Sequence, residues 1–236
     1  MKNSLKHTFK NKWKKIRFNL SATNHPMFTF YYKNLYSPKK GSLADFISNY
    51  SKSKRGEFFV IQIGANDGIT NDPIHKFIKR DHWKGVLLEP QPKVFETELS
   101  KIYQLDKGIY PICAAIGSED GSQKLYKISF CDSRWATGLA SFSLDKLKSA
   151  FKNGVVKKNC VKEGIQIDAE GYDLEVIKIF DIAKTNPEAI IFENENLNAK
   201  DLASCCLMLI ENGYQLGKFG RDTLALKSGN NQFNRF

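Results

Sequence analysis

Long apolar runs and paired cysteines are both absent from this sequence of 236 residues. No apolar run approaches the roughly 18 residues of a membrane-spanning helix, and the basic N-terminus lacks the apolar stretch of a secretory signal. We therefore expect a soluble, cytoplasmic protein. The cysteines form no Cys-x-x-Cys pair, which argues against a disulfide framework or a zinc site and favours buried free thiols. They are Cys113, Cys131, Cys160, Cys205 and Cys206.

Acidic residues are missing from the first 44 positions, which hold ten Lys and Arg and leave the rest of the chain nearly neutral. Apolar side chains recur there at helical spacing among lysines, namely Leu5, Phe9, Trp13, Ile16 and Leu20. The pattern predicts a basic amphipathic helix at residues 1–20, within an N-terminal extension of residues 1–45. We expect its apolar face to dock on the rest of the protein. Peripheral contact with the inner face of an anionic membrane is the next alternative, and nucleic-acid binding ranks lower because no recognition motif accompanies the charge.

Strand-like and helix-like segments alternate over residues 46–236, which indicates one α/β domain. The short, continuous apolar runs are typical of parallel strands covered on both faces. The predicted strands are Phe58–Ile63, Gly85–Glu89, Ile109–Ala114, Gly164–Ile167, Ala189–Phe192 and Thr223–Lys227. The predicted helices include Pro92–Gln104, Tyr172–Lys184 and Ala199–Asn212. Gln123–Ser129 alternates in polarity instead, which favours an antiparallel strand near the sheet edge.

Two features follow the first two predicted strands, at the sheet edge where α/β proteins bind ligands. The turn GANDG, residues 64–68, comes directly after the first strand. Its glycines allow a tight turn and a close approach of the backbone to a ligand. Glu89 ends the second strand, at a distance along the chain that suits a carboxylate accepting the two hydroxyl protons of an adenosine ribose. Together they indicate a nucleoside cofactor site, although Asn-Asp-Gly is also ordinary turn chemistry.

The missing phosphate-binding motifs narrow the choice of cofactor. The sequence has neither G-x-G-x-x-G nor G-x-x-x-x-G-K-[ST], the motifs that hold pyrophosphate or nucleotide phosphates. The turn offers carboxylate and amide groups instead. These suit the cationic and zwitterionic parts of S-adenosylmethionine better than a phosphate.

The segment GIQIDAEGYDLEVIK, residues 164–178, adds Asp168 and Glu170 after a fourth apolar run. At this point the chain resembles the FkbM family of S-adenosylmethionine-dependent methyltransferases. The resemblance covers roughly residues 56–227 and rests on IQIGANDG, LLEPQPKVF, CAAIGSEDG, IQIDAEGYDLEVIK, AIIFEN and DTLALK in that order. It implies a Rossmann-like, mostly parallel sheet of seven strands with helices on both faces, in which DTLALK is the last, antiparallel strand.

The resemblance also implies a role for each matching residue. Gly64, Ala65, Asn66, Asp67 and Gly68 would surround the methionine end of the cofactor, and Glu89 would bind the ribose hydroxyls. Ala114, Ala115 and Ile116 would border the adenine. Asp168 is the first candidate for the base that accepts the proton of the acceptor hydroxyl, and Glu170 is the second. The alternative is that Asp168 orients the cofactor and Glu170 caps the following helix.

Several positions keep a second interpretation. Asp67, Asp168, Glu170, Glu193 and Glu195 carry oxygen ligands suited to magnesium, but acids are equally expected around a cationic cofactor, so no metal is predicted. His75 and His82 are expected at the surface. Trp135 and Gly138 would border the acceptor. The alternative for Trp135 is an ordinary position in the core.

One junction departs from the family pattern. Lys162 and Glu163 connect two runs that relatives separate by a longer element. Either the two runs form one irregular strand or hairpin, or a segment is missing between Val161 and Gly164, which we favour.

The function expected from these features is O-methylation of a hydroxyl on a carbohydrate, such as a glycan precursor, or on a polyketide-like metabolite. The carbohydrate is preferred because the family often serves glycan biosynthesis. The alternative is a noncatalytic protein of the same fold that binds a membrane or RNA through its basic arm.

Overall fold

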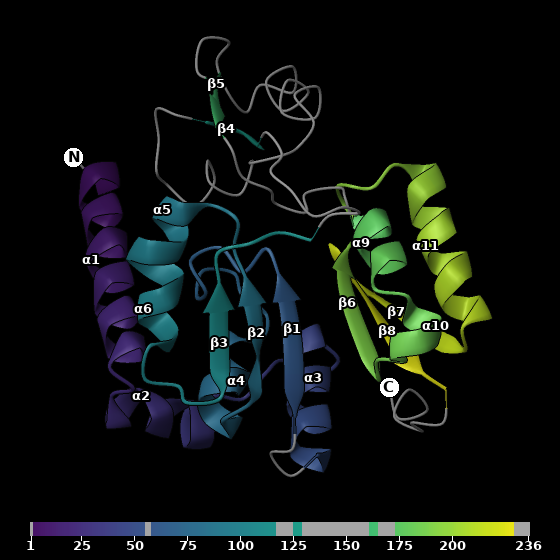
Figure 1. Ribbon diagram of the computed structural model, residues 1–236. Coiled ribbons are helices and arrows are strands. Elements are labelled where there is room, and N and C mark those ends of the chain that lie inside the picture. The colour runs from purple at the N-terminus through teal and green to yellow at the C-terminus, as the bar shows by residue number, and fades with distance from the viewer. Residues whose placement is uncertain (1, 55–57, 117–124, 129–160, 165–172, 229–236) are drawn as a thin grey trace. The chain divides into compact units, whose positions relative to one another are not determined.

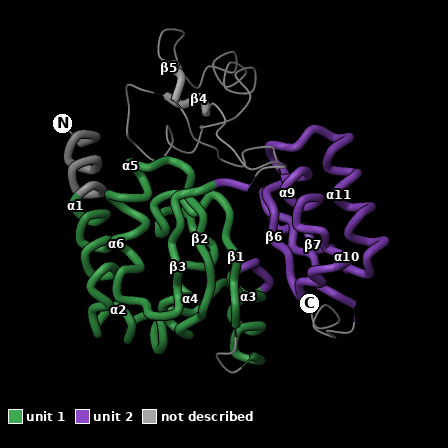
Figure 2. Tube along the Cα trace, in the orientation of Figure 1, with its two compact units in different colours: residues 1–40, 44–114 green, residues 41–43, 115–236 purple. Residues whose placement is uncertain are grey.

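The computed structural model describes residues 2–54, 58–116, 125–128, 161–164 and 173–228 (Figure 1). The chain forms two compact units, residues 1–40 with 44–114 and residues 41–43 with 115–236 (Figure 2). The basic N-terminal segment therefore belongs to the same compact unit as the first three strands. The domain boundary at residue 45 stays a prediction.

The first unit is built on a parallel sheet of three strands in the order β1-β2-β3. These strands are β1 (Phe59–Ile63), β2 (Lys84–Leu88) and β3 (Ile109–Ile112). The helix α4 (His75–Asp81) connects β1 to β2. A continuous helical segment connects β2 to β3 and consists of α5 (Pro92–Val94), a π-helical turn (Phe95–Leu99) and α6 (Ser100–Tyr103). The first three predicted strands and the helix predicted at 92–104 are confirmed within two residues at each end.

Helices cover one face of this sheet. In Figure 1 α4 and α3 (Leu43–Ser53) lie behind the strands, and Phe77, Ile78 and Leu87 are fully buried. The other face exposes apolar side chains in neighbouring strands, because Ile61, Val86 and Tyr110 stand side by side in the register. Phe59, Ile61, Tyr110 and Ile112 are all exposed. The expectation that both faces of the parallel strands are covered is therefore wrong at these positions.

The basic N-terminal segment is helical, as predicted. It contains α1 (Lys2–Ala22), α2 (Pro26–Phe30) and a π-helical turn (Tyr31–Leu35). The predicted apolar face of α1 is buried only in part where it is described. Trp13 and Ile16 are 54% and 48% exposed and Leu20 is half-buried, whereas Ser21 and Ala22 are buried. The side chains of Leu5 and Phe9 lie outside the described residues.

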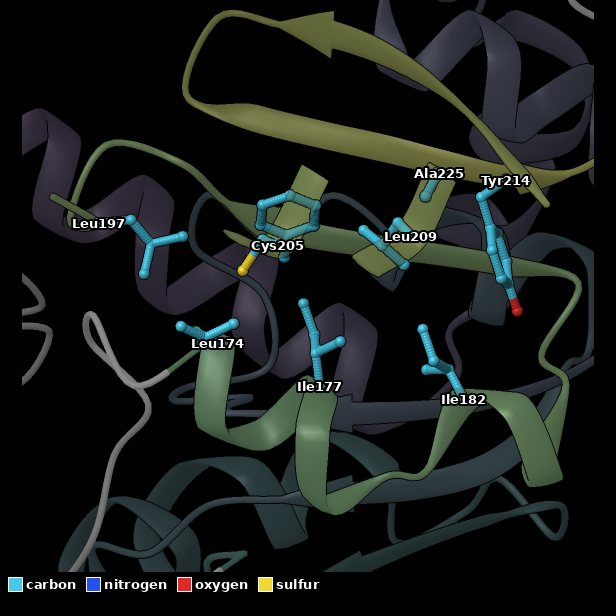
Figure 3. Packing of buried hydrophobic residues seen from close by; sticks show 9 residues of the cluster. Leu174, Ile177, Ile182, Leu197, Cys205, Leu209, Tyr214 and Ala225 are labelled. Carbon is cyan, nitrogen blue, oxygen red and sulfur yellow. The ribbon is translucent and has the colours of Figure 1, made fainter. Parts of the chain in front are cut away.

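The second unit contains an antiparallel sheet in the order β6-β8-β7. Its strands are β6 (Ala189–Glu193), β7 (Tyr214–Phe219) and β8 (Asp222–Lys227), and its helices are α9 (Asp173–Ile179), α10 (Ile182–Thr185) and α11 (Ala199–Glu211). Figure 3 shows Leu174, Ile177 and Ile182 of α9 and α10 pointing toward Cys205 and Leu209 of α11. The antiparallel direction of β8 is confirmed. The sequence analysis missed β7.

A third pair of strands, β4 (Leu125–Ile128) and β5 (Val161–Gly164), is antiparallel. The strand predicted at Gln123–Ser129 is thus confirmed as antiparallel, with β5 as its partner. Lys162 and Glu163, the junction that departs from the family pattern, lie inside β5. Of the predicted fourth strand, Gly164 belongs to β5, and residues 165–167 lie outside the described residues.

The α/β class is confirmed, but within the described ranges the strands form three separate sheets and no continuous sheet of seven strands. No helix in the described part of the chain is long and apolar enough to cross a membrane.

Candidate functional site

The carboxyl ends of β1, β2 and β3 are joined in a row by backbone hydrogen bonds. The Ala65 N–H donates to the Leu88 carbonyl at 2.9 Å, just beyond β1. The Glu89 N–H, just beyond β2, donates to the Ile112 carbonyl at 3.1 Å, and the Ala114 N–H donates to the same oxygen at 3.0 Å. The residues that the sequence analysis selected after the first three strands therefore lie at one edge of one sheet. This is the edge where parallel α/β sheets bind ligands.

The turn of residues 64–68 has a left-handed backbone at every second position. The φ angles are 72° at Gly64, 48° at Asn66 and 68° at Gly68. Only glycine adopts this region without a steric cost, and asparagine is among the few other residues that tolerate it. At Gly68 a side chain would also collide, because an added Cβ would lie 2.7 Å from Cδ1 of Leu99.

Every backbone N–H from Ala65 to Thr70 already donates within the protein. Beyond the Ala65 bond, Asn66 donates to the Glu89 carboxylate, Asp67 to the Asn66 side chain, and Gly68 to the Ala65 carbonyl. Oδ1 of Asp67 accepts the N–H groups of Ile69 and Thr70 at 3.0 and 2.7 Å. A phosphate-binding loop needs such N–H groups to point at its ligand. This turn is therefore shaped by its own side chains and presents none of these six donors to a phosphate.

The start of the helix behind the turn is also satisfied internally. Oδ1 of Asp72 accepts the backbone N–H groups of Ile74 and His75 at 2.7 and 2.8 Å, and Oδ2 accepts from the Gln62 side chain at 3.0 Å. In dinucleotide-binding sites the pyrophosphate occupies the corresponding helix start. Asp72 takes that place here, and burial raises the pKa of its carboxyl group. Sequence reasoning missed Asp72, although an Asp shortly before a helix is a recognisable capping signal.

Glu89 is fully buried between the strand ends. Its Oε2 accepts the Asn66 N–H at 2.8 Å, and its Oε1 accepts the Gln91 N–H at 2.9 Å. These bonds fix the carboxylate against the glycine turn. A carboxylate oxygen can accept more than one hydrogen bond, which is the property that a partner of a ribose diol requires.

The remaining predicted cofactor residues follow β3. Ala114 belongs to the first unit, Ala115 and Ile116 belong to the second, and all three are half-buried. Asp168 and Glu170, the two candidate catalytic residues, lie outside the described residues, as do Trp135 and Gly138.

The acids considered as metal ligands do not gather in the described part of the chain, where no group of three or more His, Cys, Asp or Glu is placed to hold a metal ion. Glu193 and Glu195 instead form ion pairs with Arg221.

Two expectations about individual side chains are wrong. His75 is 1% exposed and lies in the interior behind the glycine turn, whereas His82 is exposed as expected. Cys113 is an exposed thiol, while Cys205 is buried and its pKa is raised by burial to about 11. Partial burial raises the pKa of Cys113, and the charges of Glu89 and Glu96 add to the effect. Cys131 and Cys160 lie outside the described residues.

No curated protein matches this chain. The family model of the methyltransferase FkbM domain matches residues 62–216, well over half of the sequence. The match begins within β1 and takes in the glycine turn, Glu89 and the end of β3. The chain therefore belongs to the FkbM family of methyltransferases.

Proposed function

We propose that this protein is an S-adenosylmethionine-dependent O-methyltransferase that acts on a hydroxyl of a carbohydrate or of a polyketide-like metabolite. The observation that carries the cofactor assignment is the buried Glu89 carboxylate, held by two backbone N–H groups against the turn of residues 64–68. Membership of the FkbM family supports methyl transfer as the reaction.

The internal hydrogen bonds of the site favour this cofactor over a dinucleotide. A phosphate would find the N–H groups of residues 65–70 and the start of α4 already bonded. S-adenosylmethionine combines an adenosine ribose with a methionine moiety and carries no phosphate. Glu89 would bind the ribose hydroxyls, the turn would surround the methionine end, and residues 114–116 would border the adenine.

When bound, S-adenosylmethionine supplies a sulfonium methyl group that is a good electrophile. The protein then has to align the acceptor oxygen and take up its proton. We propose Asp168 as the proton acceptor and Glu170 as the second candidate, without a metal. The carbohydrate preference rests on the family resemblance.

We also propose the complete fold of the family, a mostly parallel sheet of seven strands whose last strand is antiparallel. The antiparallel pairing of β8 with both β6 and β7 supports the direction of that last strand.

Calorimetric titration of the full chain tests the cofactor. S-adenosylmethionine and S-adenosylhomocysteine should bind, whereas NAD⁺ and ATP, which share the adenosine and add phosphates, should bind far more weakly. Binding of NAD⁺ or ATP at least as tightly as S-adenosylmethionine would overturn the assignment.

Methyl transfer is tested with cofactor labelled in the methyl group, first on candidate glycans and then on cell extract. Label in a carbohydrate or polyketide-like product, in an ether bond, is the expected result. Cofactor binding without transfer to any of these acceptors would favour the noncatalytic alternative.

A further inference from the structure

We propose that α1 is a positioning element of the cofactor site, which holds the glycine turn from behind through Arg17 and through a buried chain of side chains that begins at Ser21. The inference rests on the proposed function, since it assigns a role in cofactor binding to a segment that the family match at residues 62–216 does not include. Its structural part concerns the turn itself and can be tested without any ligand.

The first contact is direct. Nη2 of Arg17, in α1, donates to the Ile69 carbonyl at 2.6 Å across 52 residues of sequence. Ile69 is buried, and its own N–H is held by Asp67. A guanidinium donor makes this a charge-assisted hydrogen bond, roughly twice as strong as a neutral one. Arg17 therefore fixes the carbonyl side of the peptide that closes the turn.

The second contact is a chain of three side chains behind the same turn. The Tyr103 hydroxyl donates to the Gly68 carbonyl at 3.2 Å. Its oxygen lies 3.1 Å from Nδ1 of His75, and Nε2 of His75 lies 3.1 Å from the hydroxyl oxygen of Ser21. Because the one hydroxyl hydrogen of Tyr103 goes to Gly68, its oxygen accepts from Nδ1 of a neutral His75. Nε2 then accepts from Ser21, so hydrogen bonds run in one direction from α1 to the turn.

Lys79 fastens the end of α1 to this chain. Its Nζ, in α4, donates to the Ser21 carbonyl at 3.0 Å and to Oδ1 of Asn24 at 2.7 Å. The same ammonium group also donates to the Ile102 carbonyl and pairs with Asp106, and the Lys79 side chain is 4% exposed. Breaking such a buried pair by removing one partner is strongly destabilising. The position of Ser21 is thus set by α4 and α6, the elements that supply His75 and Tyr103.

The N–H groups of the turn and the carbonyls of Gly68 and Ile69 have hydrogen-bond partners in different parts of the chain. The N–H groups from Ala65 to Thr70 are bonded close by, to residues of the turn itself or of the β2 end. The carbonyls of Gly68 and Ile69 are held by Tyr103 and Arg17, and Arg17 and Ser21 both come from α1. Without α1, the Ile69 carbonyl loses its guanidinium donor and His75 loses the Ser21 hydroxyl. The turn would then be less ordered before the cofactor binds, and ordering it would weaken binding.

The experiment compares Arg17→Ala with Lys15→Ala in the full chain, because each removes one cation from α1 and Lys15 is exposed. Amide hydrogen exchange of residues 66–70 is measured without ligand, and S-adenosylhomocysteine affinity is measured by calorimetry. Arg17→Ala should speed exchange in the turn and weaken binding about tenfold, the effect of losing one hydrogen bond to a charged group. Lys15→Ala should change neither. Arg17→Lys keeps a cationic donor, so it should restore part of the protection from exchange and part of the affinity. A purely structural loss would not show this rescue.

The outcomes separate this inference from the proposed function. Unchanged turn exchange in a folded Arg17→Ala protein overturns the inference, whatever the wild type binds. Faster exchange with unchanged affinity also overturns it, because the contact would then order the turn without serving the cofactor. If the wild type binds no S-adenosylhomocysteine, the proposed function and the cofactor role of α1 both fail. If Arg17→Ala does not fold, Ser21→Ala replaces it. Unchanged amide exchange at Gly68 in a folded Ser21→Ala protein would then overturn the inference.

Discussion

Gly68 is a position in the turn where an added methyl group meets both backbone strain and a steric clash. Its φ of 68° places a non-glycine residue in the left-handed region, and an added Cβ would lie 2.7 Å from Leu99 and 3.0 Å from Tyr103. We expect Gly68→Ala to lower the free energy of unfolding by about 2–4 kcal/mol, the sum of backbone strain and overpacking.

Gly41→Ala is the matched control for that measurement. Gly41 has a similar φ of 74° and no atom within 4 Å of an added Cβ, so it isolates the backbone term of about 1–2 kcal/mol. Urea unfolding of both variants measures the difference. Equal losses in the two variants would contradict the packing part of the argument.

Glu89 accepts hydrogen bonds from the backbone of Asn66 and Gln91 and, in the proposed function, also from the ribose hydroxyls. We expect Glu89→Ala to weaken S-adenosylmethionine binding by about 2–3 kcal/mol, the range for hydrogen bonds to charged groups. The variant should also be less stable without ligand, because the N–H groups of Asn66 and Gln91 lose their acceptor. Glu96→Ala removes an exposed acid nearby and should leave the affinity unchanged. A folded Glu89→Ala protein with wild-type affinity would remove Glu89 from the site.

Asp168 tests the catalytic part of the proposal. Asp168→Asn keeps the shape of the side chain and loses the proton acceptor, so turnover should fall by about 10²-fold or more while cofactor affinity changes less. If affinity collapses and the rate at saturation survives, Asp168 is a binding residue and Glu170 becomes the first candidate base. Chelator belongs in the same assay, since activity lost to chelation and restored by magnesium would refute the metal-free proposal.

At the scale of elements, the packing of α1, α4 and α6 around His75 makes stability depend on pH. Burial, together with the positive charges of Lys79 and Arg17, lowers the pKa of His75 well below its usual value of 6.5. As the pH falls through 6.5 the unfolded chain takes up a proton that the folded protein does not, so acidification favours unfolding. We expect the free energy of unfolding to fall by up to about 1.4 kcal/mol per pH unit in this window.

Urea unfolding of the wild type and of His75→Gln, at pH values from about 5 to 7.5, measures how the free energy of unfolding of each protein depends on pH. Asp72 acts in the opposite sense at lower pH, because its raised pKa lets the folded state take up a proton first. It is present in both proteins, so it cancels in the comparison. Equal pH slopes for the two proteins would show that His75 does not carry the effect.

Elements with a strong pattern were predictable from the sequence, and elements specified by tertiary contacts were not. Apolar runs located β1, β2, β3, β6 and β8, whereas β7 mixes Gln215, Gly217 and Lys218 among its apolar residues and was missed. Helical spacing predicted α1 but not its buried side, because α1 docks through Arg17 and Ser21 on distant partners.

At the site, the turn and Glu89 follow from their place after the strands. The buried positions of His75 and Lys79 could not be predicted, since local sequence marks both as polar surface residues.

At the scale of the whole molecule, the N-terminal segment combines positive charge with exposed apolar side chains. Trp13 and Ile16 of α1 and Met27, Phe30 and Leu35 beyond it are exposed, in a stretch of 44 residues without an acid. We propose that these exposed side chains contact anionic membranes peripherally, while α1 stays docked through Arg17 and Ser21. Basic charge attracts the headgroups, and aromatic and aliphatic side chains insert between them.

Sedimentation with anionic and neutral vesicles measures this contact. We expect binding to anionic vesicles only, weakened by salt and by Trp13→Ala. Binding to RNA that persists in Trp13→Ala and falls steeply with salt would favour the nucleic-acid alternative. Absence of binding to anionic vesicles would refute the membrane contact.

The docking of α1 also has a consequence for the order of events during synthesis. Partners of α1 and of the adjoining residue Asn24 include Ile69, His75 and Asp106, which follow their partner residues by 52, 54 and 82 positions. At about 5–20 residues per second, a ribosome needs several seconds to extend the chain from Asn24 to Asp106. The basic helix is therefore complete several seconds before all of its docking partners have been synthesised. A nascent chain of intermediate length contains α1 without the residues that hold it.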